Sequence, residues 1–221
     1  MTSFLGENGA DEEDGHGHGH GGSESTFGES RERVVRSLDD LVWTGRGTVS
    51  LDLSDEWTTL AGASVAFGPN SAGDRASTTL HGLDLTARWR PLDARRGFPF
   101  VELRSELVER EYEFDGFRDD AGDVFSRGSL RDDTWVNHVV WGFATDWTVG
   151  ARYERFHGDA PEEIGGLEDR TRWSFALTHY FSEFAKVRLQ LNRDRSDVFG
   201  EATSVWLQIE FSLGSHAAHV F

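Results

Sequence analysis

The segment KVRLQLN at residues 186–192 decides the fold, because apolar and polar side chains take turns along its whole length. Its two parities are Val187, Leu189 and Leu191 against Lys186, Arg188, Gln190 and Asn192. Successive side chains of a β-strand point to opposite faces, so a period of two predicts a strand. In an α-helix the same spacing would spread the charged groups around the whole helix. Residues 186–192 are therefore predicted to form a strand with one apolar and one polar face.

The same alternation recurs in eight further segments between Leu41 and Phe221. They cover residues 43–53, 58–67, 83–90, 98–114, 134–144, 147–154, 173–181 and 205–213. Composition agrees, since 25 Gly, 16 Phe and 8 Trp, with 4 Pro and 1 Met, favour β-structure. We therefore predict an all-β, antiparallel fold of about nine or ten strands.

The connections between these segments are predicted to alternate in length. The short ones are Ser54–Trp57, Leu92–Gly97, Thr145–Asp146 and Ser182–Phe184, and the long ones are Gly68–Ala76, Asp115–Asp133, Gly158–Arg170 and Arg195–Glu201. Barrels of the bacterial outer membrane have short periplasmic turns and longer outer loops. The pattern therefore favours an antiparallel transmembrane β-barrel over residues 41–221, with a soluble sandwich or lipocalin-like barrel as the alternative.

Aromatic residues near the ends of the predicted strands support the membrane interpretation. They are Trp57, Phe67, Trp89, Phe98, Phe114, Trp135, Trp147, Phe156, Trp173 and Phe181. Aromatic side chains are enriched at both interfaces of a bilayer. The sequence therefore predicts two aromatic girdles.

Residues 1–40 lack the alternation and are predicted to form an acidic, His/Gly-rich extracellular loop or tail. Counting back from a periplasmic Phe221 through the alternating connections places this tract outside. Its first 22 residues, MTSFLGENGADEEDGHGHGHGG, do not have the pattern of a secretory signal. We therefore expect the chain to be the C-terminal part of a larger barrel, with Met1–Leu5 ending an earlier strand. Closing the sheet edges in lipid would take further strands or a homo-oligomer.

A short run of histidines in this tract is the candidate metal site. His16, His18 and His20 alternate with glycines and follow the acidic residues Asp11–Asp14. Imidazole and carboxylate groups suit zinc or another divalent metal ion, and the spacing differs from that of a rigid structural zinc site. The alternative is a solvated loop. A second pair, His216 and His219, has a spacing too common to count as a motif.

The polar parities of the predicted strands carry both signs of charge. They comprise Arg46, Asp52, Asp84, Arg88, Arg90, Glu102, Arg104, Glu106, Arg152, Glu154, Lys186, Arg188 and Glu210. In a barrel these side chains would line a hydrated channel and filter small solutes. The alternative is that they pair across strands and fill a narrow barrel.

Several functions are disfavoured by what the sequence contains. The formal net charge of −17, from 39 acidic and 22 basic residues, opposes binding to nucleic acid. The chain has no cysteine, which excludes disulfides, thiolate metal sites and a Cys nucleophile. GxSxG, HExxH, P-loop and dinucleotide-binding motifs are not found, so we do not predict an enzyme.

The His- and acid-rich tract, the final segment SVWLQIEFSLGSHAAHVF at residues 204–221 and the porin-like alternation together carry a resemblance. The chain resembles proteobacterial outer-membrane proteins described as porin-like or as zinc-regulated TonB-dependent receptors. Its terminal Phe221 is similar to the aromatic residue that the barrel-assembly machinery recognises in such proteins. No TonB box or plug domain is visible in the sequence.

This resemblance implies a place in the outer membrane, in contact with its lipid, and passage of small solutes or metal ions. From its residues, the hypothesis for the His-rich loop is capture of zinc or another divalent metal ion. The alternative function is a non-conducting structural or metal-binding surface barrel.

Overall fold

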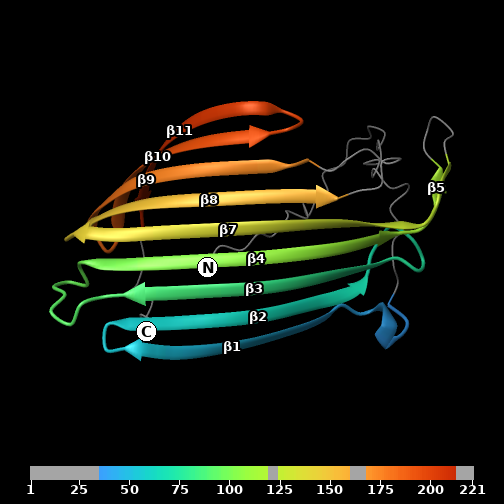
Figure 1. The fold of residues 1–221 in the computed structure, drawn as a ribbon, viewed down its shortest axis with the longest axis horizontal. Helices are drawn as coiled ribbons and strands as arrows, with labels where there is room; N and C mark the ends of the chain where they lie inside the picture. Colours follow the sequence, from blue (N-terminus) through green and yellow to red (C-terminus); the bar gives the residue numbers. More distant parts are fainter. Residues whose placement is uncertain (1–34, 119–123, 160–167, 213–221) are drawn as a thin grey trace, which may run out of the picture.

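The computed structural model describes residues 35–118, 124–159 and 168–212. Within them, nine strands form one antiparallel sheet in which neighbours along the chain are also neighbours in space (Figure 1). The strands are β1 (Trp43–Ser54), β2 (Trp57–Pro69), β3 (Ser77–Trp89), β4 (Phe100–Phe114), β7 (Gly128–Ala144), β8 (Trp147–Asp159), β9 (Arg170–Ser182), β10 (Ala185–Ser196) and β11 (Gly200–Phe211). A 3-10 turn, η1 (Leu38–Asp40), precedes β1, and the short strands β5 (Phe117–Arg118) and β6 (Val124–Phe125) pair separately. The predicted all-β, antiparallel fold is confirmed.

The register of the sheet keeps odd-numbered and even-numbered residues apart across all nine strands. Val49 pairs with Ala61, which pairs with Leu85, and the same-parity pairing continues to Arg193 and Thr203 in the last two strands. Three register shifts interrupt it, each beside a tight turn. Because side chains alternate along a strand, the odd residues share one face and the even residues share the other. We call these the apolar face and the polar face.

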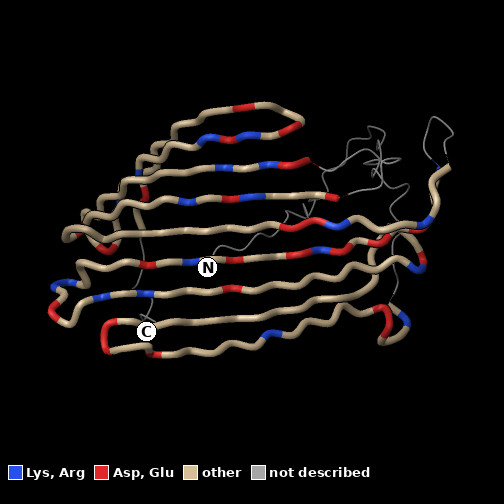
Figure 2. Tube along the Cα trace, viewed as in Figure 1, with Lys and Arg blue, Asp and Glu red and all other residues tan. Residues whose placement is uncertain are grey.

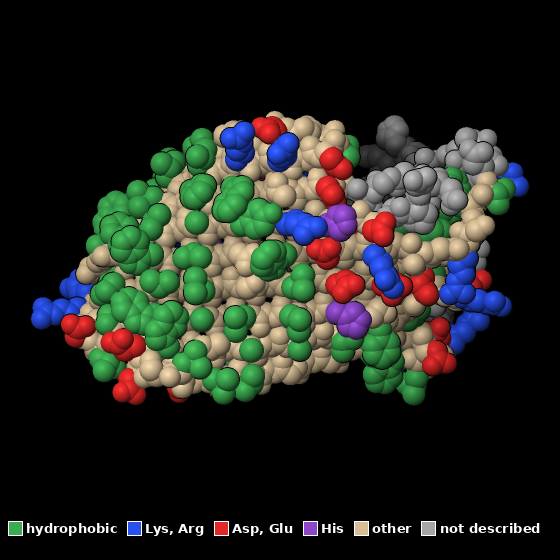
Figure 3. Space-filling model, viewed as in Figure 1, with side chains coloured by type: hydrophobic (Ala, Val, Ile, Leu, Met, Phe, Trp, Pro, Cys, Tyr) green, Lys and Arg blue, Asp and Glu red, His purple; other side chains and the backbone are tan. Residues whose placement is uncertain are grey.

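Large hydrophobic side chains occupy the apolar face and are exposed there. Leu83, Leu177 and Leu207 are 58%, 42% and 68% exposed. Figure 3 shows hydrophobic side chains gathered over most of this face, with charged side chains toward the end that carries β5. Such large exposed fractions mean that the described elements leave this face uncovered.

Successive links lie at opposite ends of the strands, but their lengths do not alternate as strictly as predicted. Residues 55–56, 145–146 and 183–184 form tight turns at one end of the strands. The link of residues 90–99 lies at that same end of the strands and is longer than the link of residues 70–76 at the other end. Two prolines, Pro91 and Pro99, contribute to its length because proline cannot donate a ladder hydrogen bond.

The predicted long loop at Arg195–Glu201 is wrong. Strands β10 and β11 stay paired as far as Ser196 and Gly200, which leaves a turn of residues 197–199. The hydroxyl of Ser196 accepts hydrogen bonds from the amides of Val198 and Phe199 at 3.1 and 2.9 Å. Gly200 adopts a φ of +77°, which glycine tolerates without steric strain.

The prediction of two aromatic girdles needs correction at three positions. Phe114 and Phe156 have even numbers and therefore lie on the polar face, where Phe114 is 1% exposed. Phe98 also lies on that side, because it comes close to the position that a Cβ would occupy at Gly142. The other seven predicted aromatics have odd numbers and lie on the apolar face. The distance of an aromatic residue from a strand end therefore does not tell on which face its side chain lies.

The sheet is open at both edges in the described part of the chain, where no strand pairs with the outer side of β1 or β11. As the first and last of nine antiparallel strands, these two strands run in the same direction. An all-antiparallel barrel therefore requires an odd number of additional strands beside these nine. Among the described residues, no helix is sufficiently long and apolar to cross a bilayer.

Candidate functional site

The polar face concentrates the charged and hydroxyl side chains of the sheet. Thr148, Ser174, Thr178 and Asn192 are all on this face and are all buried. This face is therefore the candidate functional surface.

The charged residues predicted to share a face do so, apart from Arg90, which follows β3. Acidic and basic residues lie side by side along β4, β8 and β10 (Figure 2). On the polar face many of them form ion pairs. These include Arg104–Glu102 at 2.6 Å, Arg152–Glu154 at 3.1 Å, Arg172–Asp194 at 2.6 Å and Lys186–Glu210 at 2.9 Å. Mutual pairing lowers the cost of holding many charges on one surface.

One ion pair crosses an intervening strand. Arg46 of β1 reaches Asp84 of β3 at 2.8 Å, passing over Gly62 of β2. A Cβ at Gly62 would lie 2.4 Å from Asp84 Oδ2 and 2.8 Å from Arg46 Nη2. The absence of a side chain at Gly62 therefore makes room for this pair.

A row of basic side chains crosses three neighbouring strands. Arg104 of β4 pairs in register with His138 of β7, which pairs with Arg152 of β8. The two guanidinium groups repel each other across His138, so the row needs compensating negative charge. Glu102 and Glu154 supply part of it by pairing with the two arginines along the same strands.

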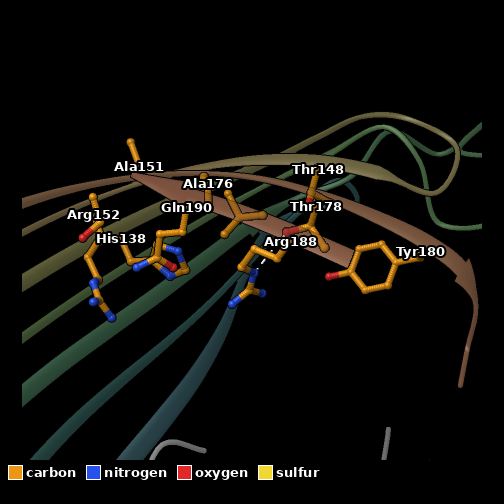
Figure 4. Close-up of a pocket in the computed structure, with 12 residues that line it drawn as sticks. His138, Thr148, Ala151, Arg152, Ala176, Thr178, Tyr180, Arg188 and Gln190 are labelled. Atoms are coloured by element: carbon orange, nitrogen blue, oxygen red, sulfur yellow. Dashed lines mark hydrogen bonds between the residues drawn. The ribbon is translucent and has the colours of Figure 1, made fainter. Parts of the chain in front are cut away.

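Beside this row the polar face is hollowed by a pocket of about 160 Å³. Its floor is made by the small residues Gly150 of β8 and Ala176 of β9, which pair in register. The pocket is lined further by His138, Thr148, Arg152, Ser174, Thr178, Tyr180, Arg188 and Gln190. Figure 4 shows His138, Arg152 and Arg188 pointing to the same side of the sheet, whereas Ala151 points away. We call this the basic pocket.

The arginines of the basic pocket have incomplete partners. Arg188 Nε donates a hydrogen bond to Thr178 Oγ1 at 3.1 Å (Figure 4), and the described residues place no carboxylate in an ion pair with it. Arg152 Nε is buried and finds no hydrogen-bond acceptor in the described part of the chain. The same holds for the hydroxyl of Ser174, a residue that is 5% exposed. The pocket thus contains donors that are ready for an anionic acceptor.

Two links are tied together where β8, β9 and β10 end. His157 Nδ1 lies 2.6 Å from Asp169 Oδ1, which also accepts a hydrogen bond from the amide of Gly158. The hydrogen bond with His157 lowers the pKa of the Asp169 carboxyl. The Asp169 amide in turn donates to Asp197 Oδ1 at 2.9 Å. These contacts hold together the links at one end of the strands.

The predicted metal ligands His16, His18 and His20 lie outside the described residues, as do His216, His219 and Phe221. Within the described ranges no group of three or more His, Asp or Glu side chains is arranged to hold a metal ion. No motif in the sequence marks His138, whereas the structure places it in the basic row. Only the register of three strands reveals that placement.

Comparisons with known proteins show a similar fold without a sequence relative. No family model and no curated protein sequence matches the chain. A solved structure of the siderophore receptor PirA from Acinetobacter baumannii matches with a TM-score of 0.51 and 12% identity. The match covers 79% of this chain and 32% of that receptor, so this chain corresponds to about a third of the receptor's length. At this identity the likeness establishes a shared all-β fold.

The space over Gly62 can be tested by substitution. We expect Gly62→Val to displace Asp84 or Arg46 and to lower the free energy of unfolding by about 1–3 kcal/mol, as overpacking commonly does. The measurement is the urea midpoint of the detergent-folded protein. Gly47→Val is the matched control, because a Cβ at Gly47 meets no atom within 4 Å. Since Val has the higher strand propensity, equal midpoints for the two variants would contradict the role given to Gly62.

Proposed function

We propose that this chain forms part of the wall of an outer-membrane β-barrel that passes small solutes. The two-faced sheet carries the proposal: one face exposes large apolar side chains, and the other carries buried hydroxyls and ion pairs. A soluble protein would cover so large an apolar surface. In a barrel, lipid covers it and the polar face borders the interior.

The height of the apolar band fits a bilayer. On β7 the odd residues from Trp135 to Phe143 are apolar except for Asn137, and Asp133 precedes them. At about 3.4 Å per residue, this segment is roughly 27 Å long, and a strand tilt of about 40° would give it a height of roughly 21 Å. A band about 25 Å tall is typical of outer-membrane barrels. Aromatic residues mark both ends of the segment, as at the interfaces of a membrane.

Lipid also constrains the sheet edges. Backbone N–H and C=O groups in the hydrocarbon layer need internal partners, so β1 and β11 must be paired in the membrane. We propose that further strands or a second copy of the chain provide those partners, and that the barrel-assembly machinery inserts the protein. The likeness to a siderophore receptor supports an uptake role for a small solute.

An arginine on the apolar face tests the contact with lipid. We expect Leu177→Arg, in the middle of the band on β9, to reduce insertion into lipid bilayers at a cost of about 2–4 kcal/mol. Thr79→Arg on β3, on the same face, outside the band and opposite Glu111, is the control and should insert normally. Folding yield in liposomes, measured by protease protection, gives the result. Equal insertion of both variants would contradict a lipid-facing surface.

Conductance of the intact protein tests passage of solutes. We expect stepwise ion conductance in planar bilayers and swelling of proteoliposomes in small sugars, because the polar face would border a hydrated path. Heat-denatured protein serves as the control. Absence of both conductance and flux, with or without zinc, would instead favour a non-conducting structural barrel.

We further propose that His16, His18 and His20 capture zinc or another divalent ion outside the cell. The support comes from the sequence, which combines imidazoles, carboxylates and glycines. Strand β1 begins at the end of the sheet where the links of residues 70–76 and 115–127 lie. The histidine tract precedes β1 in the sequence. That end of the strands would face the outside of the cell in a barrel whose tight turns face the periplasm.

Replacing His16, His18 and His20 together with Ala should weaken zinc binding at least tenfold in calorimetry, since three imidazole ligands are lost. His81→Ala, an exposed histidine on β3, is the matched control and should leave the affinity unchanged. An unaltered zinc affinity in the triple variant would exclude the histidine tract as the ligand.

A further inference from the structure

We propose that the basic pocket is a binding site for a small hydroxycarboxylate anion. The proposal deepens the proposed function, because it names a solute class for the polar face. The chain as a whole is acidic, with a net charge of −17, so a local basic site has a distinct chemical preference.

The pocket is a trough over one strand, between two arginines. Arg152 on β8 pairs in register with Ser174 on β9, and Arg188 on β10 pairs in register with Thr178 on β9. Ala176 lies between Ser174 and Thr178 in sequence and provides a small floor. The two guanidinium groups therefore flank an open space at diagonal corners.

Charge in and around the trough is not fully compensated. Arg152 Nη2 has an ion pair with Glu154 at 3.1 Å, yet Arg152 Nε has no hydrogen-bond acceptor among the described residues. Arg188 has a hydroxyl partner, Thr178, in place of a carboxylate. His138 adds a ring nitrogen donor or acceptor from the neighbouring strand. An anion would supply the acceptors that these groups lack.

The unpaired hydroxyl of Ser174 is an independent sign of a ligand. Buried hydroxyls in folded proteins nearly always have a partner, because an unsatisfied one costs stability. Ser174 is 95% buried, since 5% of it is exposed, and it lines the pocket. A ligand oxygen in the trough would satisfy it together with Arg152 Nε.

Size and donor chemistry select the ligand class. A planar guanidinium matches the two oxygens of a carboxylate, and the surrounding Thr148, Tyr180 and Gln190 offer partners for hydroxyl groups. A pocket of about 160 Å³ has room for a small acid. We therefore assign a hydroxycarboxylate of the size of malate.

Calorimetry with the intact, detergent-folded protein tests this assignment. We expect saturable binding of L-malate, no binding of its neutral diamide, and weaker binding of inorganic phosphate. Arg188→Gln should weaken malate binding at least tenfold. Arg188→Lys, which keeps the charge and loses the planar fork, should weaken it several-fold. Arg193→Gln, on β10 but on the opposite face, is the control and should bind like the unmodified protein.

Three results would overturn the proposal: no saturable malate binding, unchanged affinity in Arg188→Gln, or phosphate binding at least as tightly as malate. Circular dichroism establishes that each variant is folded, and Ser174→Ala gives a second test through a small side chain. Because binding is measured without a membrane gradient, it can succeed while bilayer conductance fails. Loss of the anion site and loss of the transport role are therefore separate outcomes.

Discussion

The constraint on which this structure depends is the same-parity register of the sheet. Each strand alternates apolar and polar side chains, and hydrogen bonding aligns odd residues with odd residues from β1 to β11. A slip of one residue in any strand would move its apolar set to the polar face. The register shifts lie beside tight turns, so they do not change which residues share a face in the rest of each strand.

The polar face shows how a sheet holds many charges at close range. Most arginines have an acidic neighbour, and Gly62 allows one pair to form over an intervening strand. The basic pocket is the local exception, because Arg188 has a hydroxyl partner and Ser174 has none. Departures of this kind from full pairing are expected where a surface binds a ligand.

The open edges of the described sheet, β1 and β11, bear on how the protein could lie in a membrane. An exposed sheet edge invites pairing with another strand, and in lipid such pairing is obligatory. Since β1 and β11 run in the same direction, the count of partner strands is constrained to be odd in an all-antiparallel barrel. The solved structure that matches is longer than this chain, which corresponds to about a third of its length.

The sequence by itself determined the nine strands and the two faces, because period-two alternation is a local property of each segment. It placed Lys186, Arg188 and Gln190 on one face correctly. It did not determine which strand residues lie opposite each other, so the row of Arg104, His138 and Arg152 could not be read from it. The link at residues 197–199 and the burial of Phe114 were likewise decided by tertiary structure. Alternation fixes the face of a residue, whereas its neighbours across strands depend on register, which is set by turn geometry and by pairing along the whole sheet.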